Sequence, residues 1–100
     1  MRTLALATGP ELVRGRITDL ENADLTPAGA VIELAVQADE LEDAPTTGWT
    51  LRDNLTTIGN STIEPAKLYT PVARGKFILW GRWTVGGETI VRPIGKFQVI

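Results

Sequence analysis

The sequence predicts an all-β protein built as an antiparallel β-sandwich of about seven strands. The chain has 100 residues, which suits one domain, and 43% of them are hydrophobic, which is enough for a folded core. Thr, Val and Ile supply 28 residues, and β-branched side chains favour strands. Turn signals recur at short intervals, and no apolar pattern of helical period is long enough to cover a parallel sheet.

The first elements are predicted from the alternation of apolar and polar residues and from the Gly-Pro turn signal that separates them. Residues 1–10 are expected to form an N-terminal arm or an edge strand, and residues 11–100 a single β-sandwich domain. Gly9-Pro10 separates the two. Apolar and polar residues alternate over residues 12–18 and again over residues 31–38, which predicts two half-buried strands joined by a polar link.

Residues 39–43 hold four carboxylates, a composition that raises the question of a calcium site. The spacing of an EF-hand loop is absent, so a solvated loop is the expected structure and no metal is predicted. Residues 48–52 then read as a short strand with Trp49 and Leu51 on one face. For residues 53–72, interrupted by Gly and Pro, we expect short strands near 56–58 and 67–72, or a helical turn after Asp53.

The strongest local pattern lies near the C-terminus. Residues 75–85 alternate as one long strand, and Gly86-Gly87 is a two-residue hairpin connection of the kind that needs positive φ twice. Residues 88–92 return along it. A kink or sheet edge is expected at residues 93–95, because Pro donates no ladder hydrogen bond, and residues 96–100 complete the sheet.

Cysteine and histidine are both absent. Their absence removes disulfides, thiolate nucleophiles, imidazole bases and Cys/His zinc sites. An enzyme would have to use other groups, and the candidate carboxylates Glu33, Glu64 and Glu88 are expected at outward strand positions or at turns, so neither an enzyme nor a cofactor is expected. The formal net charge of −2 and pI near 5.0 disfavour a nucleic-acid binder. No segment has the length of a signal-peptide core or a membrane span. Residues 1–50 carry −6 and residues 51–100 carry +4, which makes the domain a dipole unless antiparallel strands interleave the halves.

The tryptophans are the first candidate site residues. Trp83 shares a strand face with Phe77 and Leu79 and is expected in the core. Trp80 points to the other face with Ile78 and Arg82. An aromatic residue beside Arg is typical of a binding surface, although burial of Trp80 under a loop is the competing interpretation. Trp49 either plugs one end of the core or forms, with Trp80, a stacking platform for carbohydrate.

Basic residues form the second candidate. Lys76, Arg82 and Arg92 lie on or beside the C-terminal hairpin, together with Arg74 and Lys96. They could dock onto an acidic neighbour, for example residues 39–43 of an adjacent copy. The alternative is that they keep exposed strand edges soluble.

Several short motifs resemble those of small immunoglobulin-like domains in virion proteins of tailed bacteriophages, such as the N-terminal modules of upper-baseplate proteins and head–tail accessory proteins. Asp24–Leu34 is similar to the Leu-Thr-Gly-Ala stretch that opens those domains, with Pro27-Ala28 inserted. The remaining similar segments are Tyr69-Thr70-Pro71, Lys76–Trp80, Gly86–Thr89 and Phe97-Gln98-Val99. Residues 53–67 have no counterpart.

The resemblance implies an immunoglobulin-like sandwich and a non-enzymatic virion structural protein that acts as an adaptor, decoration or connector. Its expected partners are capsid, connector or tail subunits in a multi-copy assembly, with no nucleic acid and no membrane; the expected location is the virion, assembled in the host cytoplasm. The alternative is a small carbohydrate-binding module that uses exposed tryptophans. The expected interface residues are Ile78, Trp80, Arg82, Arg92, Lys76 and Trp49.

Overall fold

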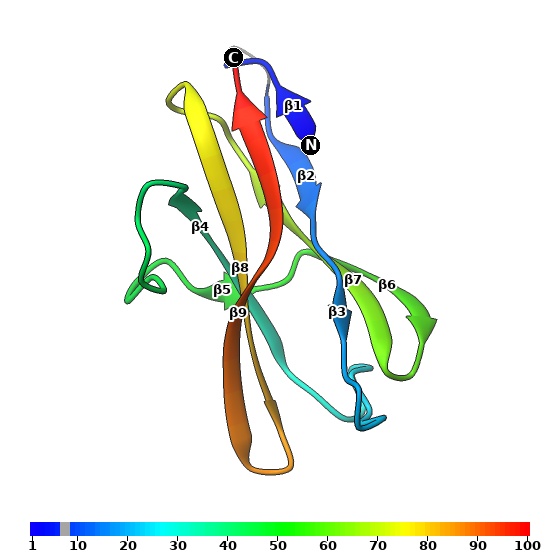
Figure 1. Ribbon diagram of the computed structural model, residues 1–100. Helices are drawn as coiled ribbons and strands as arrows, with labels where there is room; N and C mark the ends of the chain where they lie inside the picture. Colours follow the sequence, from blue (N-terminus) through cyan, green and yellow to red (C-terminus); the bar gives the residue numbers. More distant parts are fainter. Residues whose placement is uncertain (7–8) are drawn as a thin grey trace.

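The computed structural model describes residues 1–6 and 9–100, and within them nine strands form two sheets (Figure 1). The prediction of an all-β, sandwich-like fold is confirmed. The five-stranded sheet contains, in spatial order, β1 (Arg2–Leu4), β9 (Glu88–Val99), β8 (Gly75–Val85), β4 (Ile32–Ala38) and β5 (Thr50–Leu51). The four-stranded sheet contains β2 (Glu11–Arg14), β3 (Ile17–Thr18), β7 (Thr62–Tyr69) and β6 (Asn54–Gly59).

The expectation of a wholly antiparallel sandwich of about seven strands needs two corrections. Strand β1 runs parallel to β9, with Arg2 opposite Phe97 and Leu4 opposite Val99, so the five-stranded sheet is mixed. A parallel pair is possible because the two strands stand at opposite ends of the sequence and no hairpin joins them. Strands β2 and β3 also count separately, although both pair with the same edge of β7 in one continuous register.

Pro65 explains the interruption between β2 and β3. It lies inside the central strand β7, and its carbonyl accepts a hydrogen bond from the Gly15 N–H at 3.1 Å. A proline has no N–H with which to return the bond, so the ladder breaks opposite it. The next residue, Arg16, turns its N–H to the Ile94 carbonyl of the other sheet at 3.2 Å. The chain therefore bridges both sheets at this point.

Residues 53–72, expected to be short separate strands or a helical turn, hold the whole antiparallel hairpin of β6 and β7, whose register shifts between Thr57 and Gly59. The helical turn after Asp53 is wrong. The Asp53 N–H donates to the Ala66 carbonyl at 2.9 Å, and its carboxylate accepts the Leu68 N–H at 2.7 Å. Both bonds hold Asp53 extended beside β7, and Asn60 and Ser61 connect the two strands.

The kink expected at residues 93–95 is a β-bulge. Trp80 lies opposite Pro93 and Leu79 opposite Gly95, which leaves Ile94 as the extra residue. Ile94 packs against the core between two glycines: a Cβ on Gly15 would stand 2.5 Å from Ile94 Cγ1. A Cβ on Gly81 would stand 3.2 Å from Ile94 Cγ2.

Side chains from both sheets fill the core, and Trp83, 6% exposed, lies within it as predicted. The buried cluster consists of Leu4, Val13, Ile17, Leu25, Ile32, Leu34, Ile63, Leu79, Trp83, Phe97 and Val99. Both termini lie at one end of the sandwich, and the β8–β9 hairpin projects at the opposite end beside the β3–β4 connection (Figure 1). The ends therefore present different sets of loops.

Candidate interaction surface

The outer face of the five-stranded sheet is organised around an ion pair between Glu33 and Arg82. These residues lie opposite each other on β4 and β8. Arg82 Nε and Nη2 donate to Glu33 Oε1 at 3.1 and 3.0 Å, and each side chain is 33% exposed. The register continues this row of side chains to Leu51 on one side and Val91 on the other. An ion pair flanked by apolar residues thus crosses the sheet.

Trp49 lies against this ion pair. The Arg82 Cζ atom stands 4.5 Å from the centre of the Trp49 ring, within the range of a cation–π contact. The indole Nε1 donates to the Pro45 carbonyl at 2.9 Å, which holds the ring in the β4–β5 connection. The same connection is tied to β4 by a bond of 2.6 Å from Gln37 Nε2 to the Asp43 carbonyl. Residues 39–49 are therefore anchored to the outer face of the sheet.

Ile78 and Trp80 are buried, at 8% and 7% exposure. Buried Leu79 lies between them, and buried Gly81 follows, so the sheet is covered on both faces here. Of the two interpretations of Trp80, the structure agrees with burial. Its ring face is not free for a sugar, so Trp49 and Trp80 do not form an exposed stacking platform.

The basic residues singled out from the sequence do not share one face. Arg82 lies opposite Val91, whereas Arg92 lies opposite Gly81, so their side chains leave the sheet on opposite sides. Lys76 is near the start of β8 and shares the outer face with Arg82. Among the residues that the structure describes, neither Lys76 nor Arg92 has an acidic partner within 4.0 Å, and both are exposed. They remain available cations, whereas Arg82 is already paired.

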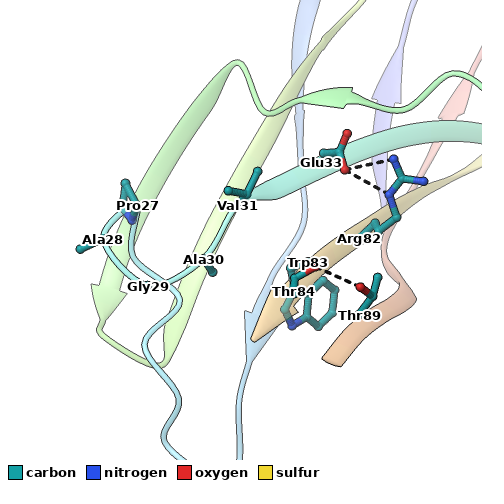
Figure 2. Close-up of a pocket in the computed structure, with 10 residues that line it drawn as sticks. All are labelled: Pro27, Ala28, Gly29, Ala30, Val31, Glu33, Arg82, Trp83, Thr84 and Thr89. Carbon is teal, nitrogen blue, oxygen red and sulfur yellow. Dashed lines mark hydrogen bonds and ion pairs between the residues drawn. The ribbon is translucent and has the colours of Figure 1, made fainter. Parts of the chain in front are cut away.

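A groove of about 690 Å³ lies beside the Glu33–Arg82 pair (Figure 2). One wall is the chain that leads into β4. The other is the part of the β8–β9 hairpin next to its turn, where the Thr84 and Thr89 hydroxyls are 3.0 Å apart. The lining residues are Pro27, Ala28, Gly29, Ala30, Val31, Glu33, Arg82, Trp83, Thr84 and Thr89. The sequence interpretation missed this groove because its walls are brought together only by the pairing of β4 with β8.

Asp24 organises the turn that forms the first wall. Its Oδ1 accepts the Thr26 hydroxyl at 2.6 Å and the Thr26 N–H at 2.9 Å, and these hydrogen bonds lower the pKa of the Asp24 carboxyl below its ordinary value. Leu25 is fully buried, and its N–H donates to the Asn60 carbonyl at 2.7 Å. A Cβ on Gly29 would lie 2.4 Å from the Asp24 carbonyl oxygen, so glycine is required there.

A second groove, of about 620 Å³, lies at the end of the sandwich that carries the hairpin. Trp83, Ile90 and Ile94 supply apolar walls, and Arg92 stands at its side. Arg16, which also lines it, is bound to Glu64 at 2.9 Å. Further lining residues are Ile17, Thr18, Asp19, Leu20, Glu21, Ala23, Val85, Gly86, Glu88 and Pro93.

The charged residues of the negative half, residues 1–50, and of the positive half, residues 51–100, lie beside each other in the fold. Negative Glu33 of the first half faces positive Arg82 of the second, and Arg16 of the first half pairs with Glu64 of the second. The alternative in which antiparallel strands mix the halves therefore describes the fold better than two separate charged faces. In residues 1–6 and 9–100, no three acidic side chains gather in a group that could hold a metal ion. No helix in that part of the chain is long and apolar enough to cross a membrane.

Compared with known proteins, the chain matches no family model, no curated protein and no solved structure. The geometry described above and the motif resemblance are thus the basis for a functional proposal.

Proposed function

We propose that the chain is an immunoglobulin-like sandwich that serves as a structural module of a tailed-phage virion. The observation that carries the proposal is the order of the strands. In immunoglobulin lettering, β9-β8-β4-β5 has the order G-F-C-C′, and the other sheet, with β2 and β3 taken as one strand, has the order B-E-D. The parallel strand β1 then takes the place of an A′ strand beside G. The antibody disulfide has no counterpart, since the chain has no cysteine.

The turn at residues 24–30 supports the resemblance to phage domains. Within that stretch Asp24 caps the turn, Leu25 anchors it in the core, and Gly29 permits a close approach of the backbone. A turn held in this way sets the start of β4 and thereby one wall of the groove. The resemblance at residues 24–30 therefore involves residues that stabilise the domain. Residues that resemble a motif by chance would more often lie on the surface without a structural role.

A structural role needs surfaces for neighbours, and the loops at the two ends of the sandwich offer them. Leu20 in the β3–β4 connection is 90% exposed, and Val72 in the β7–β8 connection is 80% exposed. Unpaired Lys76 and Arg92 add charge that an acidic neighbour would complement. Each contact is small, and repetition over many copies in a particle would raise the avidity.

Purified particles test this proposal. We expect the protein in density-purified virions at a fixed stoichiometry relative to the major capsid protein, measured by quantitative mass spectrometry. Its absence from such particles would contradict a virion role. Binding of the isolated protein to a glycan array would instead favour the carbohydrate-binding alternative.

Charge reversal tests the docking part separately. The double variant Lys76→Glu and Arg92→Glu leaves every ion pair of the described residues intact and is expected to reduce incorporation into particles at least tenfold. Arg82→Glu is unsuitable because it would set a carboxylate against Glu33. A control, Thr46→Glu with Thr47→Glu, adds two negative charges in an exposed loop, half the charge change of the reversal, and is expected to incorporate normally. Equal incorporation of all proteins would exclude docking through Lys76 and Arg92.

A further inference from the structure

One half of strand β9 forms an open edge of the five-stranded sheet. Strand β1 pairs only with Phe97–Val99, and the Ile94 carbonyl accepts the Arg16 N–H. Among the described residues, no strand covers Glu88–Arg92 on the side away from β8. The hairpin that carries this segment projects from one end of the sandwich (Figure 1). The segment therefore presents backbone groups to which another strand can add.

The hairpin turn determines which of these backbone groups face outward. In a two-residue hairpin the residues that flank the turn, Val85 and Glu88, exchange both hydrogen bonds, and bonded and non-bonded pairs then alternate along the strands. Thr89 and Val91 occupy non-bonded positions, so each directs its N–H and C=O groups to the open edge. Pro93, which has no N–H, takes the next outward position, and the ladder is regular as far as that residue.

The segment is complementary to its own reverse. Counted in both directions from Ile90, Glu88 and Arg92 stand at equal distances, and so do Thr89 and Val91. Antiparallel pairing of two such segments about Ile90 therefore sets Glu88 opposite Arg92 on both sides of the axis. Both charged residues are exposed, and neither makes an ion pair within the described part of the chain. In the same register Thr89 lies opposite Val91, so every outward N–H and C=O group of these two residues finds a partner.

The second groove, of about 620 Å³, lies beside the same face of the strand. Glu88, Ile90 and Arg92 alternate onto one face of β9 and line this groove together with Trp83 and Ile94. Ile90 lies directly opposite Trp83. An added strand would bring its own alternate side chains against an apolar wall that has a carboxylate at one end and a guanidinium at the other. The groove leaves room for them.

We propose that a second copy of this chain adds to this edge, β9 against β9 in antiparallel orientation, with a two-fold axis between the paired Ile90 residues. Charge complementarity favours a second copy over another strand, since a strand without a carboxylate opposite Arg92 would leave that cation unpaired at the interface. A register moved by two residues in either direction would set a charge opposite Ile90 instead. The interface is isologous and closes as a dimer. The inference does not rest on the virion role.

Exchanging the charges tests the register. Arg92→Glu sets a carboxylate opposite Glu88 at both ends of the interface and is expected to weaken dimerisation at least tenfold, measured by sedimentation equilibrium of the purified protein. Glu88→Arg combined with Arg92→Glu restores opposite charges across the axis and is expected to recover the dimerisation of the parent. Lys76→Glu is the matched control, because it makes the same change of charge outside the segment. A double variant that dimerises no better than Arg92→Glu, or a parent that stays monomeric up to about 1 mM, would overturn the proposal.

A single cysteine tests the position of the axis. The two Ile90 residues form a non-hydrogen-bonded pair, for which the Cα atoms are about 4.5 Å apart, within the span of a disulfide. Thr89 is more exposed, but its two copies lie off the axis, with Cα atoms more than about 7 Å apart. The chain has no cysteine of its own.

Under mild oxidation, Ile90→Cys is therefore expected to form a disulfide-linked dimer at least tenfold faster than Thr89→Cys. Equal rates in two variants that keep the circular-dichroism spectrum of the parent would contradict the pairing about Ile90. Failure of the dimer in either experiment leaves the particle measurement of the virion role unaffected, because that measurement counts the protein in virions.

Discussion

Among single residues, Gly15 shows how the two sheets constrain one position. It stands where β2 breaks from β3, and an added Cβ would lie 2.7 Å from the Ile94 carbonyl oxygen as well as 2.5 Å from the Ile94 side chain. A side chain can rotate away, but a backbone oxygen in a bulge cannot move without disturbing the sheet. Glycine is therefore required at position 15 by the packing between the sheets and not by its backbone dihedral angles.

We expect Gly15→Ala to lower the free energy of unfolding by about 1–3 kcal/mol, the usual cost of overpacking. Urea unfolding followed by tryptophan fluorescence measures it. Gly59→Ala is the control, since no atom lies within 4 Å of its Cβ position and its φ is not positive. A loss of stability in Gly59→Ala as large as that in Gly15→Ala would show that glycine flexibility, not the clash, is responsible.

Asp24 gives the fold a dependence on pH. Its pKa in the folded protein is lowered from 3.8 by the hydrogen bonds from Thr26. A lowered folded pKa means that the carboxylate stabilises the fold above the unfolded value and loses this effect as the pH falls through the folded value. We expect Asp24→Asn to be less stable than the parent at pH 7, with the difference shrinking below pH 3.8. A difference between the urea midpoints that stays constant from about pH 7 to about pH 2.5 would contradict this role.

Among the elements, the β8–β9 hairpin depends most directly on its turn residues. Gly86 and Gly87 have φ values of 58° and 79°, the left-handed region that a type I′ turn requires at both positions. No atom lies within 4 Å of either Cβ position, so backbone conformation alone sets the cost of a side chain. The turn thus fixes the register in which Thr84 faces Thr89.

We expect Gly87→Ala to cost about 1 kcal/mol, whereas Gly86→Asn costs only a few tenths, because Asn tolerates the left-handed region. Thermal unfolding of the two variants measures the difference. A similar loss of melting temperature in both would mean that the turn is not held in this geometry.

The outer face of the five-stranded sheet depends on Arg82, which contacts Glu33 and Trp49 at once. We expect Arg82→Met to lower the free energy of unfolding by about 1 kcal/mol, since both partners are partly exposed and screened. Arg82→Glu is expected to cost more, because two carboxylates would then meet. The double variant Arg82→Glu with Glu33→Arg restores the pair, and recovery of the urea midpoint checks it. If the urea midpoint does not recover, the loss of stability comes from the lost contact between Arg82 and Trp49 and not from the ion pair.

For the molecule as a whole, one core joins the sheets, so a large cavity should weaken both together. Trp83 lies on β8 and packs in the cluster that also contains Ile17 of β3 and Ile63 of β7. We expect Trp83→Ala to cost about 3–5 kcal/mol. Hydrogen exchange measured by mass spectrometry should show faster exchange in β7 as well as β8. Faster exchange confined to β8 would contradict a shared core.

Local pattern was sufficient for much of the fold. Alternation predicted the strands at residues 12–18, 31–38 and 75–85, and Gly86-Gly87 predicted the hairpin that follows the last of them, because period and turn chemistry act over a few residues. It also predicted Trp83 in the core. The β6–β7 hairpin was missed because Pro65 disfavours a central strand, and that preference is overridden where Pro65 faces the break at Gly15.

The candidate surface was harder to predict than the strands. Ile78 and Trp80 read as an outward face, but both are buried, and the β4–β5 connection is tied to β4 by Gln37 and contacts Arg82 through Trp49, residues far from one another along the chain. Arg82 and Arg92 are close in sequence, yet the β8–β9 register directs them to opposite sides. Neither outcome can be read from alternation, because both depend on which segments meet.

The all-β class, the long hairpin and the absence of cysteine and histidine chemistry are properties of the residues and hold wherever the strands are placed. The parallel strand β1, the grooves, the burial of Trp80 and the open edge of β9 arise only when distant segments pair. The physical reason is range. Backbone preference and turn geometry act between neighbours in sequence, whereas burial, register between sheets and unpaired edges depend on the packing of the whole chain.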